Sequence, residues 1–397
     1  MLEIRLKPGR AKSVLRGHPW IFSGSIASDQ GEIGIEKPGQ TVRVVDAKST
    51  FLAWGAISPQ STIRIRLWSQ REDEAIGEDY FEKRLRAAVN LRSELNLSDK
   101  VNAFRLVHGE SDGLPGLIVD QYDQTLVAQF LTCGVEYWRE TIIEHLRSIT
   151  GCSRIYERSD VDIRRLEGLE PSKGPLMGEE MSDPVEIHEG DLRYFVDIAQ
   201  GQKTGFFLDQ RDNRAMVREL AAEKVVLDCF AYTGGFSIAA LKGRAKHSTA
   251  LEASEAAIKL GKENLSLNQI PSERAEWLEA DVFKQLRKFR DGRRTFDMVI
   301  LDPPKFAPTA AHAQKAARGY KDINLLALKL LNPGGLLVTF SCSGGVGPEL
   351  FQKIVAGAAQ DAGVNAKIIR RLGPGVDHPV ALNFPEGAYL KGLVIQI

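Results

Sequence analysis

The second half of the chain shows apolar runs of strand length that mostly alternate with stretches of helical periodicity. The runs lie at 225–229, 247–251, 275–279, 297–301, 334–341, 366–370 and 390–396. Such alternation is typical of a doubly wound, largely parallel β-sheet with helices on both faces. Ligands bind these sheets at the carboxyl ends of the strands. We therefore expect a seven-stranded Rossmann-like α/β domain over residues 191–397, with its site at those strand ends.

The amino-terminal part shows a different pattern, with short β-type runs separated by Gly, Pro and Ser. TVRVV at 41–45 and TIRIRLW at 62–68 favour a small β-barrel over residues 1–75. In the second run the isoleucines fall on one face and Arg64 and Arg66 on the other, as in a half-exposed strand. We expect these two arginines to form a solvated face.

An acidic run at 71–79 ends the β-pattern, and a helical pattern follows it. The apolar positions at helical spacing are Phe81, Leu85, Ala88, Leu91 and Leu95. From 100 to about 190, segments typical of strands and of helices are mixed. The pattern thus predicts a small α+β middle domain over residues 76–190.

The composition of the 397 residues is that of a globular protein, with 43% hydrophobic and 26% charged residues. At roughly 150 residues per domain, this length favours two to three domains. No run approaches the ~18 apolar residues of a membrane-spanning helix, and the first twenty residues hold five Lys or Arg without a following apolar run. We expect a cytoplasmic protein that does not contact a membrane.

The four cysteines, Cys133, Cys152, Cys229 and Cys342, lie far apart, and the chain has neither a CxxC nor an HExxH motif. Neither a disulfide framework nor a metal site is therefore expected. Cysteine is commonly a small buried apolar residue. Cys133, Cys152 and Cys229 are interpreted in that way.

The net charge is zero, with 52 basic and 52 acidic residues, but the charges are unevenly distributed. Residues 1–71 hold 11 basic and 5 acidic residues, so a polyanionic partner should bind there. The expected RNA-binding residues are Arg5, Lys7, Arg10, Lys12, Arg16 and Trp20, with His18 beside them. Cations neutralise phosphates, and aromatic rings stack on unpaired bases. A second basic cluster, at 284–294, is expected to be a solvated helix face.

A glycine-containing turn follows the first strand of the α/β domain. The strand VVLD ends at Asp228 and continues as CFAYTGGFSIAAL, so that Phe230, Thr233, Gly234 and Gly235 lie between strand and helix. Backbone N–H groups and a helix amino terminus meet a ligand in such a turn. The adjacent glycines do not form GxGxxG, so a bound pyrophosphate is disfavoured.

Two further carboxylates follow the next strands. Glu252 in ALEAS lies about 20 residues further on, where an acid can bind ribose hydroxyls. Asp281 in EADVF follows the third strand, where a small polar residue can bind the adenine amino edge. Each acid by itself is more often a surface residue or a helix cap. Their recurrence at successive strand ends favours a nucleoside-type cofactor.

The motifs VVLDCFAYTGGF, ALEAS, EADVF and LDPPKF, in that order, resemble those of the class I S-adenosylmethionine-dependent methyltransferases over roughly 190–397. The resemblance implies S-adenosyl-L-methionine as cofactor and S-adenosyl-L-homocysteine as product. It also implies that Asp228 lies near the methionine moiety and that Glu252 binds the ribose. Asp281 would then contact adenine, and Asp302 would line the methyl-transfer site.

Two further strand ends carry the expected chemistry. In LDPPKF two prolines form a stiff corner after Asp302, and Lys305 stands where an amino-group methyltransferase typically has an aromatic residue. In LLVTFSCSGG, Cys342 ends the next strand. C5 of a pyrimidine becomes nucleophilic only after a group adds to C6, and a thiolate suits that addition. We expect Cys342 to be the nucleophile and Asp302 to hold the N3 edge of an unpaired or flipped cytosine.

The chain as a whole is similar to the large-subunit (23S) ribosomal RNA cytosine-C5 methyltransferases with an amino-terminal PUA domain. The similarity rests on LKPGRAKSVLRGHPWIFSGSI, GESDGLPGLIVDQYD, GQKTGFFLDQRDNR and, near the end, DHP and FPEGAYLKGL. It implies methylation of one cytosine in ribosomal RNA, a PUA-like domain that holds RNA, and a tendency to form homodimers. It also implies that the segment 201–214, with Gln210 and Arg211, covers the cofactor.

The residues leave two alternatives open. Methylation of a purine does not need Cys342, and a ribosome-assembly RNA-binding factor can retain the cofactor fold without turnover. The intact Asp302 and Cys342 argue against the non-catalytic factor. Many RNA cytosine-C5 methyltransferases carry a second cysteine directly after the proline motif, where this chain has Lys305. His378 in DHP is expected to be a structural histidine.

Overall fold

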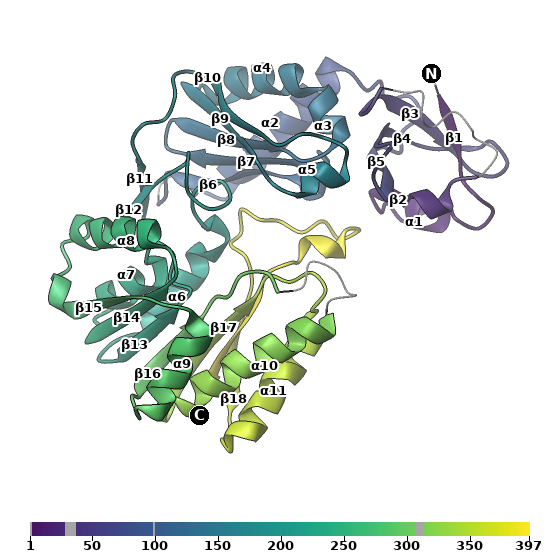
Figure 1. The fold of residues 1–397 in the computed structure, drawn as a ribbon. Helices are drawn as coiled ribbons and strands as arrows, with labels where there is room; N and C mark the ends of the chain where they lie inside the picture. The colour runs from purple at the N-terminus through teal and green to yellow at the C-terminus, as the bar shows by residue number, and fades with distance from the viewer. Residues whose placement is uncertain (1, 28–36, 98–99, 307–312) are drawn as a thin grey trace. The chain divides into compact units, whose positions relative to one another are not determined.

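The computed structural model describes residues 2–27, 37–97, 100–306 and 313–397. The chain forms two compact units (Figure 1). The first consists of Met1–Ile187, Val196–Phe206 and Val376–Gly387, and the second of His188–Phe195, Phe207–Gly375 and Ala388–Ile397. Two short segments from later in the chain therefore belong to the first unit. The domain limits expected at 75 and 190 stay predictions.

The first unit begins with a five-stranded sheet in the order β1-β3-β4-β5-β2. Its strands are β1 (Glu3–Arg5), β2 (Trp20–Phe22), β3 (Thr41–Val45), β4 (Phe51–Ile57) and β5 (Ile63–Ser69), and the short helix α1 (Lys12–Leu15) precedes β2. Alternate residues of these strands, among them Ile4, Val42, Val44 and Ile65, are fully buried in one apolar cluster. The period-two alternation of the sequence thus builds this core.

Arg66 corrects the expectation of a solvated arginine face on β5. Its guanidinium donates to Glu167 Oε2 at 2.9 Å, and both side chains are buried. Ser58 Oγ donates to the same oxygen at 2.7 Å. Arg64 is half-buried and donates to the carbonyl of Pro59. A period-two pattern separates the two faces of a strand, but it does not show whether another segment covers the polar face, as Glu167 does here.

A second five-stranded sheet in the first unit has the order β10-β9-β8-β7-β6. Its strands are β6 (Ala103–His108), β7 (Leu117–Tyr122), β8 (Thr125–Phe130), β9 (Arg154–Ser159) and β10 (Ser172–Met177). Helices α2 (Glu78–Glu94) and α4 (Arg139–Thr150) contribute Phe81, Leu85 and Ile142 to its core. The short helices α3 (Cys133–Tyr137) and α5 (Ile163–Leu166) flank β8 and β9 in the sequence, and β11 (Val185–Glu189) and β12 (Leu192–Val196) form a separate two-stranded sheet.

Helix α2 departs from the expected apolar stripe at its carboxyl end. Leu91 is exposed, whereas the neighbouring Arg92 is buried. Arg92 donates to Asp112 Oδ1 at 2.7 Å and to the carbonyl of Arg105 at 3.0 Å. The side chain of Arg92 therefore points into the core, where the hydrophobic pattern predicted Leu91.

The second unit contains a seven-stranded sheet in the order β15-β14-β13-β16-β17-β19-β18. Its strands are β13 (Val225–Cys229), β14 (His247–Glu252), β15 (Ala275–Glu279), β16 (Phe296–Leu301), β17 (Leu331–Ser341), β18 (Lys367–Leu372) and β19 (Lys391–Gln396). β13 is parallel to β14 and β16, and β16 is parallel to β17, whereas β19 is antiparallel to both its neighbours. Each strand begins and ends within three residues of its expected position.

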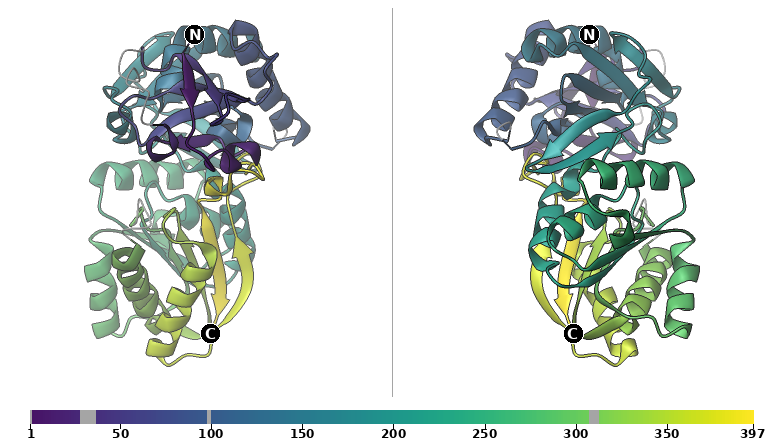
Figure 2. Two further views of the ribbon diagram at one scale, coloured as in Figure 1. Left: turned by 90° about the vertical axis from the view of Figure 1, so that its right-hand side faces the viewer. Right: turned by 90° about the vertical axis from the view of Figure 1, so that its left-hand side faces the viewer.

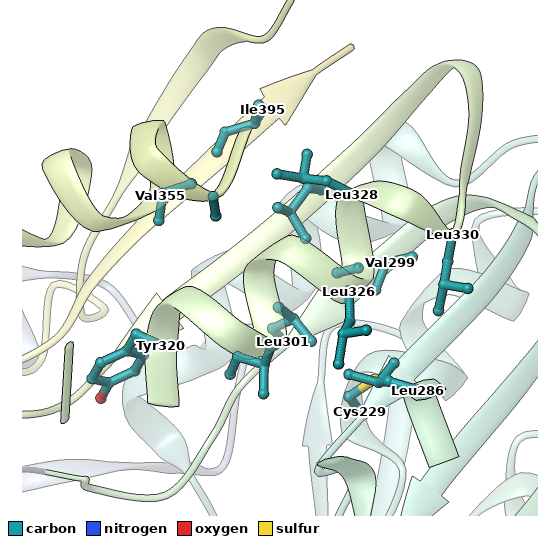
Figure 3. Close-up of a cluster of buried hydrophobic side chains, with 14 of the residues drawn as sticks. Cys229, Leu286, Val299, Leu301, Tyr320, Leu326, Leu328, Leu330, Val355 and Ile395 are labelled. Atoms are coloured by element: carbon teal, nitrogen blue, oxygen red, sulfur yellow. The ribbon is translucent and has the colours of Figure 1, made fainter. Parts of the chain in front are cut away.

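Helices cover both faces of this sheet (Figures 1 and 2). One layer consists of α6 (Arg211–Leu220), α7 (Gly235–Lys242) and α8 (Glu255–Leu267), and the other of α9 (Val282–Asp291), α10 (Ala313–Lys329) and α11 (Pro348–Ala362). The second layer packs on the sheet through a buried cluster that includes Leu286, Val299, Leu301 and Tyr320 (Figure 3). The carboxyl ends of the parallel strands are left at one edge between the layers.

Candidate active site

The parallel strands bring three of the expected acids to one edge of the sheet. Asp228 is the penultimate residue of β13, Glu252 is the last residue of β14, and Asp302 follows β16. β13 lies between β14 and β16 in the sheet. Burial, and then the charges of Asp302 and Glu252, raise the pKa of Asp228 to about 7. Asp228 is therefore close enough to each of the other two acids for their charges to affect it.

Asp228 is a buried carboxyl group with only one oxygen engaged. Its Oδ2 accepts hydrogen bonds from the Ser237 amide at 2.9 Å and from the Ser237 hydroxyl at 2.7 Å. Its Oδ1 is buried without a hydrogen-bond partner among the described residues. Such an oxygen is costly unless a ligand donates to it. An ammonium group would both donate to Oδ1 and offset the burial that disfavours ionisation, so the residue fits the amino-acid end of the implied cofactor.

The turn from β13 into α7 has an unusual backbone. Phe230, Tyr232 and Gly234 have φ angles of 63°, 49° and 80°. Such angles cost free energy for residues with side chains, and they cluster at functional sites. Gly234 is the N-cap residue of α7, and a Cβ there would lie 2.5 Å from the Trp277 ring. The side chain of Thr233 is buried, and its Oγ1 has no hydrogen-bond partner among the described residues.

Glu252 holds this turn by its carboxylate. Its Oε2 accepts from the Tyr232 amide at 2.8 Å, and its Oε1 accepts from the amides of Ala253 and Ser254 at 2.8 and 3.0 Å. A carboxylate has about four acceptor positions, so these three bonds leave capacity for a ligand hydroxyl. Glu252 is only half-buried, which fits a ribose-binding position.

Asp281 is a helix cap, which is one of the two structural roles that the sequence analysis allowed for it. It is exposed and is the N-cap residue of α9, where its Oδ1 accepts from the Lys284 amide at 2.9 Å. An N-cap carboxylate stabilises a helix start. Contact of Asp281 with adenine stays a prediction.

Cys342 lies beside the proline turn that follows Asp302. Its Sγ is 4.0 Å from the carbonyl oxygen of Pro303, within reach of a weak S–H···O contact. The side chain is partly exposed, whereas Cys133, Cys152 and Cys229 are buried. β16 and β17 are adjacent and parallel, so their ends bring the thiol and the DPP motif to the same place.

Tyr320 and Lys391 also border Cys342, and the sequence analysis missed both. The Tyr320 hydroxyl lies 2.9 Å from both Ser341 Oγ and Ser343 Oγ, the hydroxyls on either side of the cysteine. Lys391 Nζ donates to the carbonyls of Ser343 and Val346 at 2.8 and 2.7 Å. The serines in SCSGG are the signal that a polar network surrounds this thiol, but their partners come from α10 and β19, distant in sequence.

The segment expected to cover the cofactor is divided between the units. Thr204 belongs to the first unit, where its hydroxyl donates to Asp120 Oδ2 at 2.7 Å. Gln210 and Arg211 belong to the second unit and are buried. Gln210 Oε1 accepts from Asn213 Nδ2 at 2.6 Å at the start of α6. Cofactor contacts of Gln210 and Arg211 stay predictions.

Most of the expected RNA-binding residues have accessible charges. Lys7, Arg10, Lys12 and Arg16 are exposed, and Arg5 is half-exposed. Trp20 differs, because its ring is part of an aromatic cluster. Its Nε1 donates to Glu110 Oε1 at 2.8 Å, and its ring packs edge-on against that of Phe384, with centroids 4.8 Å apart. Sequence reasoning missed Phe384, because it lies in a distant segment; Phe22, whose centroid is 6.4 Å from that of Trp20, is exposed.

Two remaining candidates have structural partners. His378 is buried, with Nδ1 3.2 Å from Asp377 Oδ1, as a structural histidine would be. In the second basic cluster, Arg287 donates to both carboxylate oxygens of Asp322 at 2.9 and 2.8 Å. This cluster is therefore partly neutralised by its own neighbours.

Across 2–27, 37–97, 100–306 and 313–397, no group of three or more His, Cys, Asp or Glu side chains could hold a metal ion. No described helix is both long and apolar enough to cross a membrane. A cavity of about 520 Å³ lies at the amino-terminal ends of β13 to β15, lined among others by Lys242, Arg244 and Arg274, away from the motifs above.

Two family models match different parts of the chain. Residues 170–383 match the family model of S-adenosylmethionine-dependent methyltransferases, and residues 4–70 match that of PUA-like domains. A solved structure described as "a putative SAM-dependent methyltransferase" from Streptococcus mutans covers 100% of both chains with a TM-score of 0.86 at 22% identity. A solved structure described as "a putative methyltransferase complexed with SAH" also covers both chains fully, with a TM-score of 0.87 at 22% identity. The predicted fold class is confirmed.

Curated relatives match over the full length. The protein "Ribosomal RNA large subunit methyltransferase I" of Cronobacter sakazakii is 45% identical over 396 residues, which is 100% of this chain and 99% of the relative. The protein of the same name from Shewanella frigidimarina is 46% identical over 396 residues, again 100% and 99% of the two chains.

Proposed function

This chain belongs to the family of ribosomal RNA large subunit methyltransferase I and is S-adenosylmethionine-dependent, and from that premise we propose that it forms 5-methylcytosine in large-subunit ribosomal RNA through a covalent adduct with Cys342. The observation that carries the proposal is the 4.0 Å distance between Cys342 Sγ and the carbonyl oxygen of Pro303, the residue after Asp302. This chemistry requires a nucleophile and a carboxyl group that can both reach the same base.

We propose that the cofactor lies along the ends of β13, β14 and β15. Asp228 Oδ1 would accept from the methionine ammonium, and Glu252 from the ribose hydroxyls. The turn with Phe230, Thr233, Gly234 and Gly235 would form one wall, while Asp281, Gln210 and Arg211 complete the surroundings. When bound, S-adenosylmethionine supplies an electrophilic methyl group.

The residues of the chain then act on the cytosine. The Cys342 thiolate forms a bond to C6, and the electron pair of the C5–C6 double bond moves toward C5 while Asp302 shares a proton with N3. C5 uses that pair to form the bond to the methyl carbon, whose bond to the sulfonium sulfur would break so that S-adenosyl-L-homocysteine leaves. Loss of the C5 proton to a base restores the double bond as the carbon–sulfur bond breaks, and the thiolate is regenerated. A paired base is inaccessible to this thiol, so the target is unpaired or flipped out.

We also propose that the first unit binds the RNA through Arg5, Lys7, Arg10, Lys12, Arg16 and Trp20. Four of the five cations are exposed, which supports contact with phosphates. The PUA-like match over 4–70 covers all of these residues.

Replacement of Cys342 tests the proposal. We expect Cys342→Ala to lower transfer of labelled methyl to ribosomal RNA by on the order of 10⁴-fold or more, since the nucleophile is lost. Cys152→Ala is the matched control, because this thiol is buried in the first unit. Nucleoside analysis of the product separates 5-methylcytidine from methylated purines. Full activity of Cys342→Ala would exclude the covalent route, and an inactive wild-type protein that binds RNA would favour the assembly factor.

A further inference from the structure

Lys391 lies next to Cys342 through the pairing of β17 with β19, and Lys305 lies close enough to Lys391 for their charges to interact. Lys391 is the first residue of β19 and is buried, whereas Lys305 follows the proline turn and is exposed. In the antiparallel pairing of β17 with β19, Lys391 is opposite Ser341, the residue before the cysteine. The backbone register thus brings the buried lysine next to the thiol.

The ammonium group of Lys391 is bound to the loop that contains the cysteine. Its Nζ donates to the carbonyl of Ser343, the residue after Cys342, at 2.8 Å and to that of Val346 at 2.7 Å. An ammonium has three donors, and these bonds use two of them. Burial lowers the pKa of Lys391 to about 8, the charge of Cys342 opposes that shift, and the charge of Lys305 adds to it. The lysine and the thiol therefore interact electrostatically.

We propose that Lys391 is a positioning residue for Cys342, holding the loop 342–346 in place and stabilising the thiolate that attacks C6. This inference rests on the covalent mechanism proposed above. A cation beside a thiol increases the fraction present as thiolate, which is the reactive form. A buried cation is screened by salt much less than an exposed one, so Lys391 should act more strongly than Lys305.

The other titratable groups near the thiol act differently. Tyr320 is a neutral hydrogen-bonding partner, because burial raises its pKa and its hydroxyl bonds to Ser341 and Ser343. Asp302 stands at the start of the proline turn, and its ionised form would disfavour a thiolate, because like charges repel. Lys391 is thus the buried group that favours the charged sulfur.

Alkylation of the full-length protein by iodoacetamide tests the inference without RNA or turnover. The extent of reaction at Cys342 is followed by mass spectrometry of its peptide between pH 6 and 10. At pH 7 we expect Lys391→Met to react about tenfold more slowly than wild type, as for a displacement of the profile by one pH unit, with the two converging at pH 10. Lys391→Arg should stay near wild type, and Lys305→Met should shift the profile less than Lys391→Met.

The charge and the hydrogen bonds are separated by Lys391→Gln, which keeps a donor without the charge. We expect it to react as slowly as Lys391→Met. A wild-type profile for Lys391→Gln overturns the electrostatic role, and a wild-type profile for Lys391→Met overturns the proposal as a whole. If Lys391→Met does not fold, as judged by thermal melting, the Arg and Gln variants decide.

Methyl transfer provides the second readout. Lys391→Met should lower kcat about tenfold while the KM for S-adenosylmethionine stays unchanged, because the lysine acts through the thiol. An equal rise in KM would assign it to cofactor binding and overturn the proposal. Failure of the covalent mechanism is recognised separately, by full activity of Cys342→Ala, whatever the alkylation profiles show.

Discussion

Cys229 and Cys342 occupy comparable places in the seven-stranded sheet but have opposite surroundings. Cys229 is the last residue of β13, and Cys342 is the first residue after β17. Cys229 is fully buried in the cluster that includes Leu286 (Figure 3), and burial raises the pKa of its thiol well above the usual range. Cys342 is partly exposed, beside a carbonyl group and a buried lysine.

The difference shows that the surroundings of a cysteine in this sheet depend on whether it is the last residue of a strand or the first residue beyond it. Successive side chains of a strand point to opposite faces, so Cys229 points to the same face as Leu227, where both belong to the buried cluster with Leu286. One residue beyond a strand, the chain leaves the sheet and a side chain can reach the open edge, as that of Cys342 does. Residue type by itself therefore says little about reactivity.

The largest effect is expected at Asp302, because its proline turn lies beside Cys342. We expect Asp302→Asn to lower kcat by roughly 10²- to 10⁴-fold, the range for loss of a proton-transferring group. The amide keeps the shape but cannot share a proton with N3. Single-turnover methyl transfer measures the effect, and calorimetry checks that the cofactor still binds. Asp291→Asn is the control, since this carboxylate is exposed at the end of α9. Undiminished turnover by Asp302→Asn would contradict the assigned role.

Asp228, next to Cys229, should make cofactor binding depend on pH. Its pKa is raised to about 7 in the free protein, so the carboxylate that we propose to pair with the cofactor ammonium is lost as the pH falls through 7. We expect the affinity for S-adenosylmethionine to fall by up to about tenfold for each pH unit below 7. Calorimetry from pH 5.5 to 8.5 measures this, and Asp228→Asn should bind more weakly at pH 8 with a flat profile.

The same shift predicts the pH dependence of stability without ligand. Because the folded pKa of Asp228 lies above its ordinary value of 3.8, the folded state holds its proton more tightly than the unfolded state. This residue therefore destabilises the fold increasingly as the pH rises from about 4 to 7. Asp228→Asn should remove that contribution in urea unfolding, and an unchanged pH dependence would contradict the assignment.

Cys229 itself should give the smallest effect, on stability alone. We expect Cys229→Ala to lower the free energy of unfolding by about 1–2 kcal/mol, through lost burial and a small cavity. Urea unfolding measures the loss, and methyl transfer under native conditions should persist. Loss of activity without loss of stability would break the comparison with Cys342.

Much of the second unit could be predicted from the sequence, because its central strands are buried on both faces and appear as apolar runs. The acids and Cys342 were found for the same reason, since their positions follow from where those runs end. Tyr320 and Lys391 could not be found in this way, because they reach the thiol from α10 and β19 through tertiary packing. In the first unit, the alternation along β5 predicted that Arg66 lies on the face opposite the isoleucines. It could not predict that Glu167, about a hundred residues later, pairs with Arg66 and buries it.

The division of the chain into units was the least visible feature in the sequence. The segments 196–206 and 376–387 carry no composition change that would assign them to the first unit. Their membership rests on particular polar contacts. The Thr204 hydroxyl bonds to Asp120, and Asp377 accepts from the Arg105 amide at 2.9 Å. Such pairings join residues far apart along the chain, which no local pattern records.

Asp377 has a consequence for the order in which the protein can assemble during synthesis. It is fully buried in the first unit, where its carbonyl accepts from Arg92 at 3.0 Å, although residues 207–375 of the second unit precede it in the chain. The Arg92 guanidinium on α2 pairs with Asp112, which is made early, but its bond to the Asp377 carbonyl forms only after the segment 376–387 has been made. A nascent chain stopped before residue 376 would lack this bond, so the first unit is completed only after residues 207–375 of the second unit have been made.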